Sequence, residues 1–106
     1  MLRGEVWWVN FDPSVGGETQ KIRPAVIVSN DQSNKYMNRV QVVPLTSNTS
    51  KCYPSEAYIE VAGKLSKAMA DQLATVSKLR LKSKICELSY PNILDIEHAI
   101  RVQLNL

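Results

Sequence analysis

Alternating apolar and polar side chains predict short β-strands along much of the chain. Within Glu5 to Phe11, the apolar residues Trp7, Val9 and Phe11 alternate with the mixed set Val6, Trp8 and Asn10. This pattern predicts a strand with one fully apolar face and one mixed face. Ala25 to Val28 is a nearly continuous apolar run, which is typical of a buried central strand. Pro24 lacks an amide hydrogen, so we expect it at the first position of that strand.

The same pattern resumes after a polar, turn-rich segment that begins at Asn30 and has room for one helical turn up to Met37. Arg39 to Leu45 is predicted to be a strand, and Pro44 within it favours a sheet edge, a bulge or the end of the strand. Tyr58 to Val61 is predicted to form a further strand, which Gly63 closes.

Two later segments are less clear from pattern alone. Ser66 to Val76 contains good helix formers, but its position among strands favours a strand. Leu79 to Leu88 fits a short helical turn followed by a strand from Lys84 to Leu88.

The last segment has the pattern of an amphipathic helix. Ser89 is a suitable N-cap and Pro91 falls in the first turn. An apolar stripe follows at helical spacing, formed by Ile93, Ile96, Ile100 and Leu104. Glu97 and Arg101 are four residues apart, so we expect them to pair on the polar side.

Together these segments predict five to seven short strands and a C-terminal helix. At 106 residues the chain is expected to form a single domain, 1–106. The predicted class is mainly β (α+β), with a strongly bent or barrel-like sheet of antiparallel strands.

Composition and charge limit the compartment and the kinds of ligand expected for this protein. The net charge of +3 is a mild basic bias, compatible with nucleic acid. No signal peptide, membrane span or metal-ligand spacing is recognisable, and Cys52 and Cys86 are too few for a disulfide framework. We therefore expect a reduced, cytoplasmic protein with no metal and no cofactor.

The candidate chemistry centres on the segment from Gly16 to Asn30, which combines a glycine-rich loop, Glu18, Gln20 and Arg23. An arginine held where a loop meets a strand is suited to an anionic phosphate. Thr46 and Ser47 follow the next predicted strand and offer hydroxyl groups, and Asp71 is a second candidate proton acceptor.

This residue set fits metal-free cleavage of RNA, in which the 2′-OH attacks the adjacent phosphate. Each residue taken singly also has an ordinary structural explanation, such as a capping threonine or a surface Glu–Arg pair.

Four blocks in order resemble the MazF/PemK family of toxins from type II toxin–antitoxin systems. They are RGEVWWVNFDP from Arg3, GGETQKIRPAVIVSN from Gly16, VVPLTSN from Val42 and MADQLATV from Met69. The resemblance implies an SH3-like barrel of the CcdB/PemK kind with a C-terminal helix, and a homodimer. It implies a sequence-specific, metal-independent endoribonuclease (an mRNA interferase) that cleaves single-stranded RNA to a 2′,3′-cyclic phosphate and a 5′-OH. It further implies a cognate, MazE-like antitoxin with a flexible, acidic tail.

The resemblance also assigns roles. Arg23 matches the catalytic arginine, which acts in relatives as general acid and steadies the phosphorane, and Thr46 matches the threonine that binds the scissile phosphate. Glu18 and Asp71 match two carboxylates proposed to act in different branches, so the general base stays open between them. Six of the residues expected to bind substrate lie in the matched blocks, and Lys51 lies just after the third block: Gly17, Gln20, Lys21, Ser47, Asn48, Lys51 and Gln72.

One position departs from the PemK branch, in which an arginine precedes the aspartate by two residues. Met69 stands there in this chain, so Arg23 is expected to carry the positive charge alone. Two alternatives belong to other classes of function. One is a non-catalytic, CcdB-like poison that binds a protein such as gyrase, and the other is an RNA-binding barrel without activity.

Overall fold

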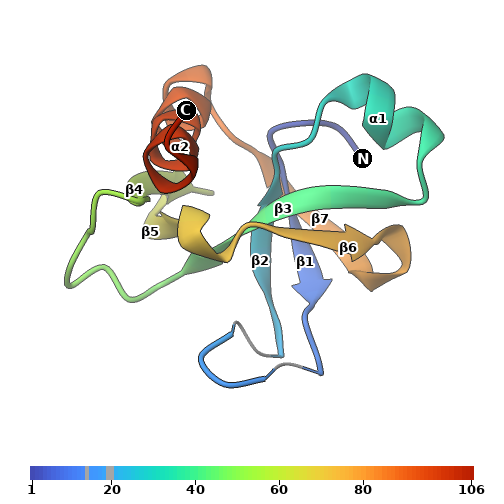
Figure 1. Ribbon diagram of the computed structural model, residues 1–106, viewed down its shortest axis with the longest axis horizontal. Coiled ribbons are helices and arrows are strands. Elements are labelled where there is room, and N and C mark those ends of the chain that lie inside the picture. The colour runs from blue at the N-terminus through green and yellow to red at the C-terminus, as the bar shows by residue number, and fades with distance from the viewer. Residues whose placement is uncertain (14, 19–20) are drawn as a thin grey trace.

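The computed structural model describes residues 1–13, 15–18 and 21–106. Strands dominate, and the chain closes with a long helix (Figure 1). The elements in order are β1 (Glu5–Asn10), β2 (Ile22–Ile27), α1 (Asp31–Tyr36), β3 (Arg39–Thr46), β4 (Glu56–Val61), β5 (Lys64–Met69), the 3₁₀ turn η1 (Ala70–Gln72), β6 (Ala74–Ser77), the 3₁₀ turn η2 (Lys78–Arg80), β7 (Leu81–Glu87) and α2 (Tyr90–Leu104).

The strands form one bent antiparallel sheet in the order β4-β5-β3-β2-β1-β7, and β6 also pairs with β3. α2 lies against β4 and η1, whereas the connection between β1 and β2 projects away from the sheet (Figure 1). The predicted class, a mainly β fold with a bent antiparallel sheet and a C-terminal helix, is confirmed. No helix in the described residues is long and apolar enough to cross a membrane.

Two apolar clusters hold the sheet together, and β2 contributes to both. Val26 packs in a cluster with β3, β4, β5 and α2, whereas Ala25 and Ile27 pack in a second cluster with β1, β3, β6 and β7. All three side chains are buried, as the continuous apolar run predicted. Trp7 and Phe11 pack against the second cluster beside buried Val9, which confirms the apolar face of β1.

Pro44 lies inside a central strand, so the predicted edge, bulge or strand end is wrong. β3 pairs with β2 along one side through Ala25 and Pro44. Its other side pairs with β6 up to Val42 and with β5 from Leu45 onward. The carbonyl of Gln41 faces β2, and alternation therefore turns the nitrogen of Pro44 to the opposite side, into the gap between β6 and β5. A missing N–H is harmless there.

Four other expectations need correction. Pro24, expected at the first position of its strand, is the third residue of β2, because Ile22 and Arg23 already pair with β1. The single strand expected over 66–76 is two strands, because η1 turns the chain from β5 to β6 between them. The last strand starts at Leu81, directly after η2, three residues before the predicted start at Lys84. Glu97 bonds Arg3 at 2.7 Å and not Arg101, because the N-terminal segment lies beside α2.

Both helices begin at a capping side chain, and the cap at Ser89 was predicted. Ser89 accepts a hydrogen bond from the Asn92 N–H, and Pro91 lies in the first turn of α2. Asn30 caps the short α1 in the same way, through the Ser33 N–H. The stripe on α2 is buried at Ile96 and half-buried at Ile93 and Ile100, whereas Leu104 is exposed.

Candidate active site

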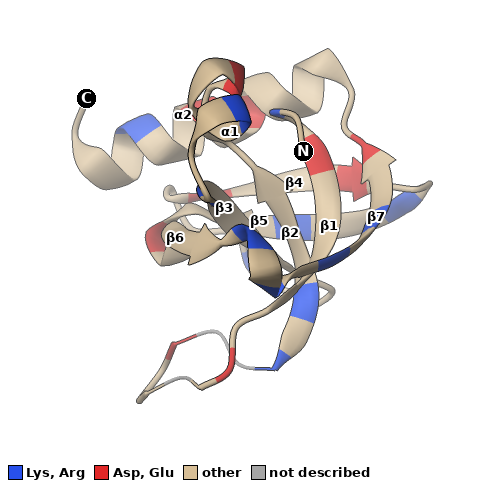
Figure 2. Ribbon diagram, turned by 90° about the vertical axis from the view of Figure 1, so that its right-hand side faces the viewer, with Lys and Arg blue, Asp and Glu red and all other residues tan. Residues whose placement is uncertain are grey.

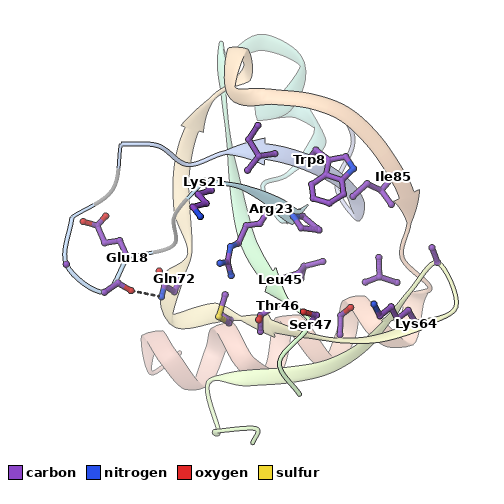
Figure 3. Close-up of a pocket in the computed structure, with 18 residues that line it drawn as sticks. Trp8, Glu18, Lys21, Arg23, Leu45, Thr46, Ser47, Lys64, Gln72 and Ile85 are labelled. Carbon is purple, nitrogen blue, oxygen red and sulfur yellow. Dashed lines mark hydrogen bonds between the residues drawn. The ribbon is translucent and has the colours of Figure 1, made fainter. Parts of the chain in front are cut away.

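A cleft of about 880 Å³ opens between β2, the end of β3, β5 and the β1–β2 connection. Most of the predicted site residues line it: Gly17, Glu18, Lys21, Arg23, Thr46, Ser47 and Gln72. The family match had placed these residues in separate loops, and the fold brings them to one place (Figure 3).

Arg23 reaches the cleft from the second position of β2, where it pairs with Val9 of β1. Its side chain is half-buried and points toward the part of the cleft that holds Thr46 (Figure 3). The Nε atom is buried and, among the described residues, has no hydrogen-bond partner. A buried donor without a partner is costly, and the position therefore suits an anionic ligand that would accept from it.

Thr46 is the last residue of β3 and is half-buried at the opposite wall. Its Oγ1 accepts a hydrogen bond of 3.2 Å from the Asn48 N–H. That bond uses a lone pair and leaves the hydroxyl hydrogen available for a ligand oxygen. Ser47 follows it, exposed on the rim.

The base of the β1–β2 connection is held by several hydrogen bonds. Phe11 N–H donates to the Lys21 carbonyl at 2.8 Å, and Lys21 N–H donates to Asp12 Oδ1 at 2.7 Å. The guanidinium of Arg80 donates to the carbonyls of Asn10 and Asp12. Lys21 has a φ of 62° and therefore sits in the left-handed region that few side chains adopt.

The far part of the connection contacts η1. Gln72 Nε2 donates to the Gly17 carbonyl at 3.4 Å, which is drawn as a dashed line in Figure 3. Glu18 lines the rim of the cleft and its Oε1 accepts from the Val15 N–H, so its carboxylate is turned away from Arg23 (Figure 3). Gln20, predicted to bind substrate, lies outside the described residues.

Three predicted site residues do not line the cleft. Asp71 is exposed on η1, next to Gln72, and Asn48 and Lys51 are exposed beyond Ser47. The Asn48 side chain accepts from Ser50, whereas the Lys51 carbonyl accepts from Lys67 Nζ. The roles of these three residues stay predictions. Of the two candidate bases, Glu18 lines the cleft and Asp71 does not.

Sequence reasoning missed the far end of the cleft, which includes Trp8, Ile85 and Lys64. Trp8 is 41% exposed and lies opposite Pro24 across the β1–β2 pairing. Its place on the mixed face of β1 was the available signal. Lys64 begins β5 directly after the Ala62–Gly63 turn, so its position depends on hairpin register rather than on any motif.

The cleft carries more positive than negative charge among its described residues. Lys21, Arg23 and Lys64 line it, and Glu18 is the carboxylate at its rim. Figure 2 shows further lysine and arginine positions along β5 and β7. Such a surface favours a polyanion.

The only histidine of the sequence, His98, is exposed on α2. Within the described residues no three His, Cys, Asp or Glu side chains gather as a metal site would require.

Comparison with known proteins identifies the family. The profile of the PemK-like, MazF-like toxins of type II toxin–antitoxin systems matches residues 2–104. Endoribonuclease MazF9 of Mycobacterium tuberculosis is 35% identical over 115 residues, covering 100% of this chain and 98% of the relative. Endoribonuclease MazF of Staphylococcus saprophyticus is 35% identical over 111 residues, covering 100% and 92%. The chain therefore belongs to the MazF/PemK family of toxins, as its four sequence blocks indicated.

Solved structures show the same fold. MazF of Deinococcus radiodurans superimposes with a TM-score of 0.88 at 23% identity, covering 100% of this chain and 97% of that one. A mycobacterial endoribonuclease in complex with its cognate antitoxin gives 0.84 at 24% identity, covering 100% and 96%. The shared architecture is a mainly antiparallel β half-barrel with a C-terminal helix.

Proposed function

We propose that this chain is the endoribonuclease toxin of a type II toxin–antitoxin pair, with residues 1–106 acting as one unit. It cuts single-stranded RNA, mRNA in the cell, at preferred sequences and without a metal ion. The observation that carries the proposal is Arg23, which lines the same cleft as Thr46 and whose buried Nε has no hydrogen-bond partner among the described residues. The full-length similarity to proteins named endoribonuclease supports it.

The chemistry requires no external nucleophile. The ribose 2′-oxygen forms a bond to the adjacent phosphorus while the bond from phosphorus to the 5′-oxygen breaks. The products are a 2′,3′-cyclic phosphate and a 5′-OH. Two protons move: the base takes one from the 2′-OH, and solvent water supplies one to the leaving 5′-oxygen.

Arg23 and Thr46 stabilise the charge that develops at phosphorus. The guanidinium offers Nε–H and its terminal N–H groups to the non-bridging oxygens, and the Thr46 hydroxyl donates from the other wall. An arginine stays charged in proteins, so stabilisation of the phosphorane accounts for Arg23 more directly than proton donation does.

We assign the general base to Glu18 in preference to Asp71. Glu18 lines the cleft, whereas Asp71 lies outside it. The Glu18 carboxylate is exposed and turned outward, so it must rotate about its side-chain bonds to reach a 2′-OH beside Arg23. The exposed position of Glu18 leaves room for that rotation.

The setting follows from the same family. Relatives include a mycobacterial endoribonuclease with its cognate antitoxin and MazE–MazF of Deinococcus radiodurans. We infer a MazE-like antitoxin whose acidic, flexible tail enters the basic cleft, a homodimeric toxin, and a cytoplasmic location where mRNA is present. The free thiols of Cys52 and Cys86 fit a reduced compartment.

The test is incubation of purified protein with a long single-stranded RNA in the presence of a chelator. Discrete cuts with cyclic-phosphate ends are expected. Arg23→Ala should lower kcat about a hundredfold to a thousandfold, and Thr46→Ala less. Arg39→Ala is the matched control, because Arg39 is exposed outside the cleft and, among the described hydrogen bonds, its guanidinium donates only to the Asn38 side chain.

Equal cutting by the parent and Arg23→Ala would refute the proposed role of Arg23. Absence of cutting by the parent would favour a non-catalytic poison or an inert RNA-binding barrel. The full-length similarity to endoribonucleases does not favour either of those alternatives.

A further inference from the structure

Side chains of the β4–β5 hairpin hold the backbone of the segment that follows Thr46, here called the 47–55 loop. Three hydrogen bonds do this: Tyr58 Oη to the Thr49 carbonyl (2.7 Å), Lys67 Nζ to the Lys51 carbonyl (2.8 Å) and the Tyr53 N–H to Glu56 Oε1 (3.0 Å). The three backbone groups belong to every second residue of the loop. The loop is therefore fixed along its length from one face of the hairpin.

Lys67 and Glu56 form a buried ion pair beneath this loop. Their charged atoms are 3.2 Å apart, and the two side chains are 9% and 10% exposed. Burying two charges is costly, and apolar replacements of such pairs are often neutral or stabilising. Stability alone is therefore a weak explanation for the pair. Its remaining hydrogen bonds go to the loop, which indicates a positioning role.

The same pair is adjacent to the proposed catalytic threonine. Thr46 pairs directly with Lys67 across β3 and β5, so the two side chains leave the sheet on the same side. The first turn of the loop returns to Thr46, where the Asn48 N–H donates to Thr46 Oγ1. This bond orients the hydroxyl, and it depends on where the loop backbone lies.

We propose that Lys67, together with Glu56, is a positioning residue for RNA cleavage. It holds the Lys51 carbonyl, and thereby the loop that orients the Thr46 hydroxyl and presents Ser47 and Asn48 at the rim. This inference rests on the proposed function and assigns a specificity-determining role to residues outside the cleft. Lys67→Met leaves the Glu56 charge buried and unpaired, so the informative variant is the double Lys67→Met/Glu56→Gln, in which neither charge remains.

The first experiment measures cleavage of a mixed RNA pool at a temperature where all variants are folded. In the double variant, kcat/KM at the preferred site should fall about tenfold to a hundredfold. The ratio of cutting at the preferred site to cutting at single-base variants should fall as well. Lys67→Arg keeps the charge and the donors and should restore most of both quantities. Tyr58→Phe removes one loop bond without burying a charge and should shift both in the same direction by less.

The matched control is Arg3→Gln. It breaks the 2.7 Å ion pair between Arg3 and Glu97 of α2, and neither residue belongs to the 47–55 loop or to the hairpin that holds it. It should change the melting temperature without changing kcat/KM or site preference. If the double variant behaves like Arg3→Gln, the pair is only structural and the proposal is wrong.

A second experiment does not depend on cleavage. Hydrogen exchange at the amides of residues 48–53 should be at least about tenfold faster in the double variant, with the β1 and β2 amides unchanged. Unchanged exchange in the loop would overturn the positioning role. Absence of RNA cleavage by the parent would overturn the proposed function instead, and the exchange data would still decide whether Lys67 fixes the loop.

Discussion

The side-chain amide of Gln72 donates a hydrogen bond to the carbonyl of Gly17 at 3.4 Å. This bond connects η1 with the β1–β2 connection across the mouth of the cleft. Gln72 was predicted to bind substrate. Its position equally allows it to hold the loop that carries Glu18.

Gln72→Ala should therefore raise KM for RNA about threefold to tenfold with a smaller change in kcat, because the loop loses one contact that orders it before substrate binds. Steady-state cleavage of a short RNA with one preferred site measures both. Gln41→Ala is a control, since Gln41 is exposed on β3 outside the cleft. A large loss of kcat with KM unchanged would contradict the tether and indicate direct contact with the reacting phosphate.

The two candidate bases can be separated by isosteric variants. Because Glu18 lines the cleft and Asp71 does not, Glu18→Gln should lower kcat about a hundredfold. Asp71→Asn should change kcat less than about threefold. The opposite order of effects would assign the base to Asp71 and require η1 to move toward Arg23.

Glu5 should make the stability of the protein depend on pH. Burial raises the pKa of this carboxyl, but hydrogen bonds from the Leu2 N–H, Trp7 Nε1 and Lys84 outweigh that effect, so the pKa lies below its ordinary 4.5. The unfolded chain therefore binds the proton more readily. The stabilisation is complete above 4.5 and is lost as the pH falls through the lower, folded pKa.

Glu5→Gln should accordingly lower the free energy of unfolding at neutral pH by roughly 1 kcal/mol. The difference from the parent should shrink as the pH falls below 4.5. Urea denaturation across this range measures the effect. Glu60→Gln, at an exposed position on β4, is the control for removing a surface carboxylate at neutral pH. A difference between Glu5→Gln and the parent that does not depend on pH would rule out the linkage.

Lys84, the ion-pair partner of Glu5, should make the stability of the protein depend on pH in the alkaline range. Hydrogen bonds to Glu87 and Glu5 raise the pKa of Lys84 above 10.5. Its contribution is complete below 10.5 and is lost as the pH rises through the folded pKa, so Lys84→Gln should differ least from the parent in strong alkali.

The β4–β5 turn offers a stability test that is independent of RNA. Ala62 and Gly63 have φ values of 49° and 80°, which is the left-handed pair that a two-residue hairpin turn requires. Alanine is strained in that region and asparagine tolerates it. Ala62→Asn should therefore raise the free energy of unfolding by about 0.5 kcal/mol, and Gly63→Ala should lower it by about 1 kcal/mol. Thermal melts measure both changes. A lower stability for Ala62→Asn together with a higher stability for Gly63→Ala would show that the turn assignment is wrong.

Local patterns predicted the elements whose signals are local. The alternation in β1, the apolar run in β2 and the cap at Ser89 each depend on neighbouring residues, and each was confirmed. The split between β5 and β6 was missed, because η1 contains no glycine or proline to mark it. Pro44 was misjudged, because the gap that accommodates it depends on the pairing of β5 and β6 with β3.

The candidate site shows the same division. Arg23 and Thr46 were found from their matched blocks, and the fold brings both to one cleft. The contacts that position the site join residues far apart in the chain: Arg80 with Asn10 and Asp12, and Lys67 with Lys51. No motif marks such pairs, so only the folded chain reveals them.

The proline in β3 has a consequence for any attempt to engineer this protein. Arg23 is carried by β2, which stays beside β3 up to Pro44, whereas Thr46 lies in the part of β3 that has already changed its outer neighbour to β5. The two groups proposed to bind the phosphate are thus attached on either side of the point where β3 changes its pairing partner from β6 to β5. A mutation that slightly rotates the β4–β5–α2 block would alter their spacing while most buried contacts survive. Turnover of RNA should consequently respond to repacking around Leu45 sooner than the melting temperature does.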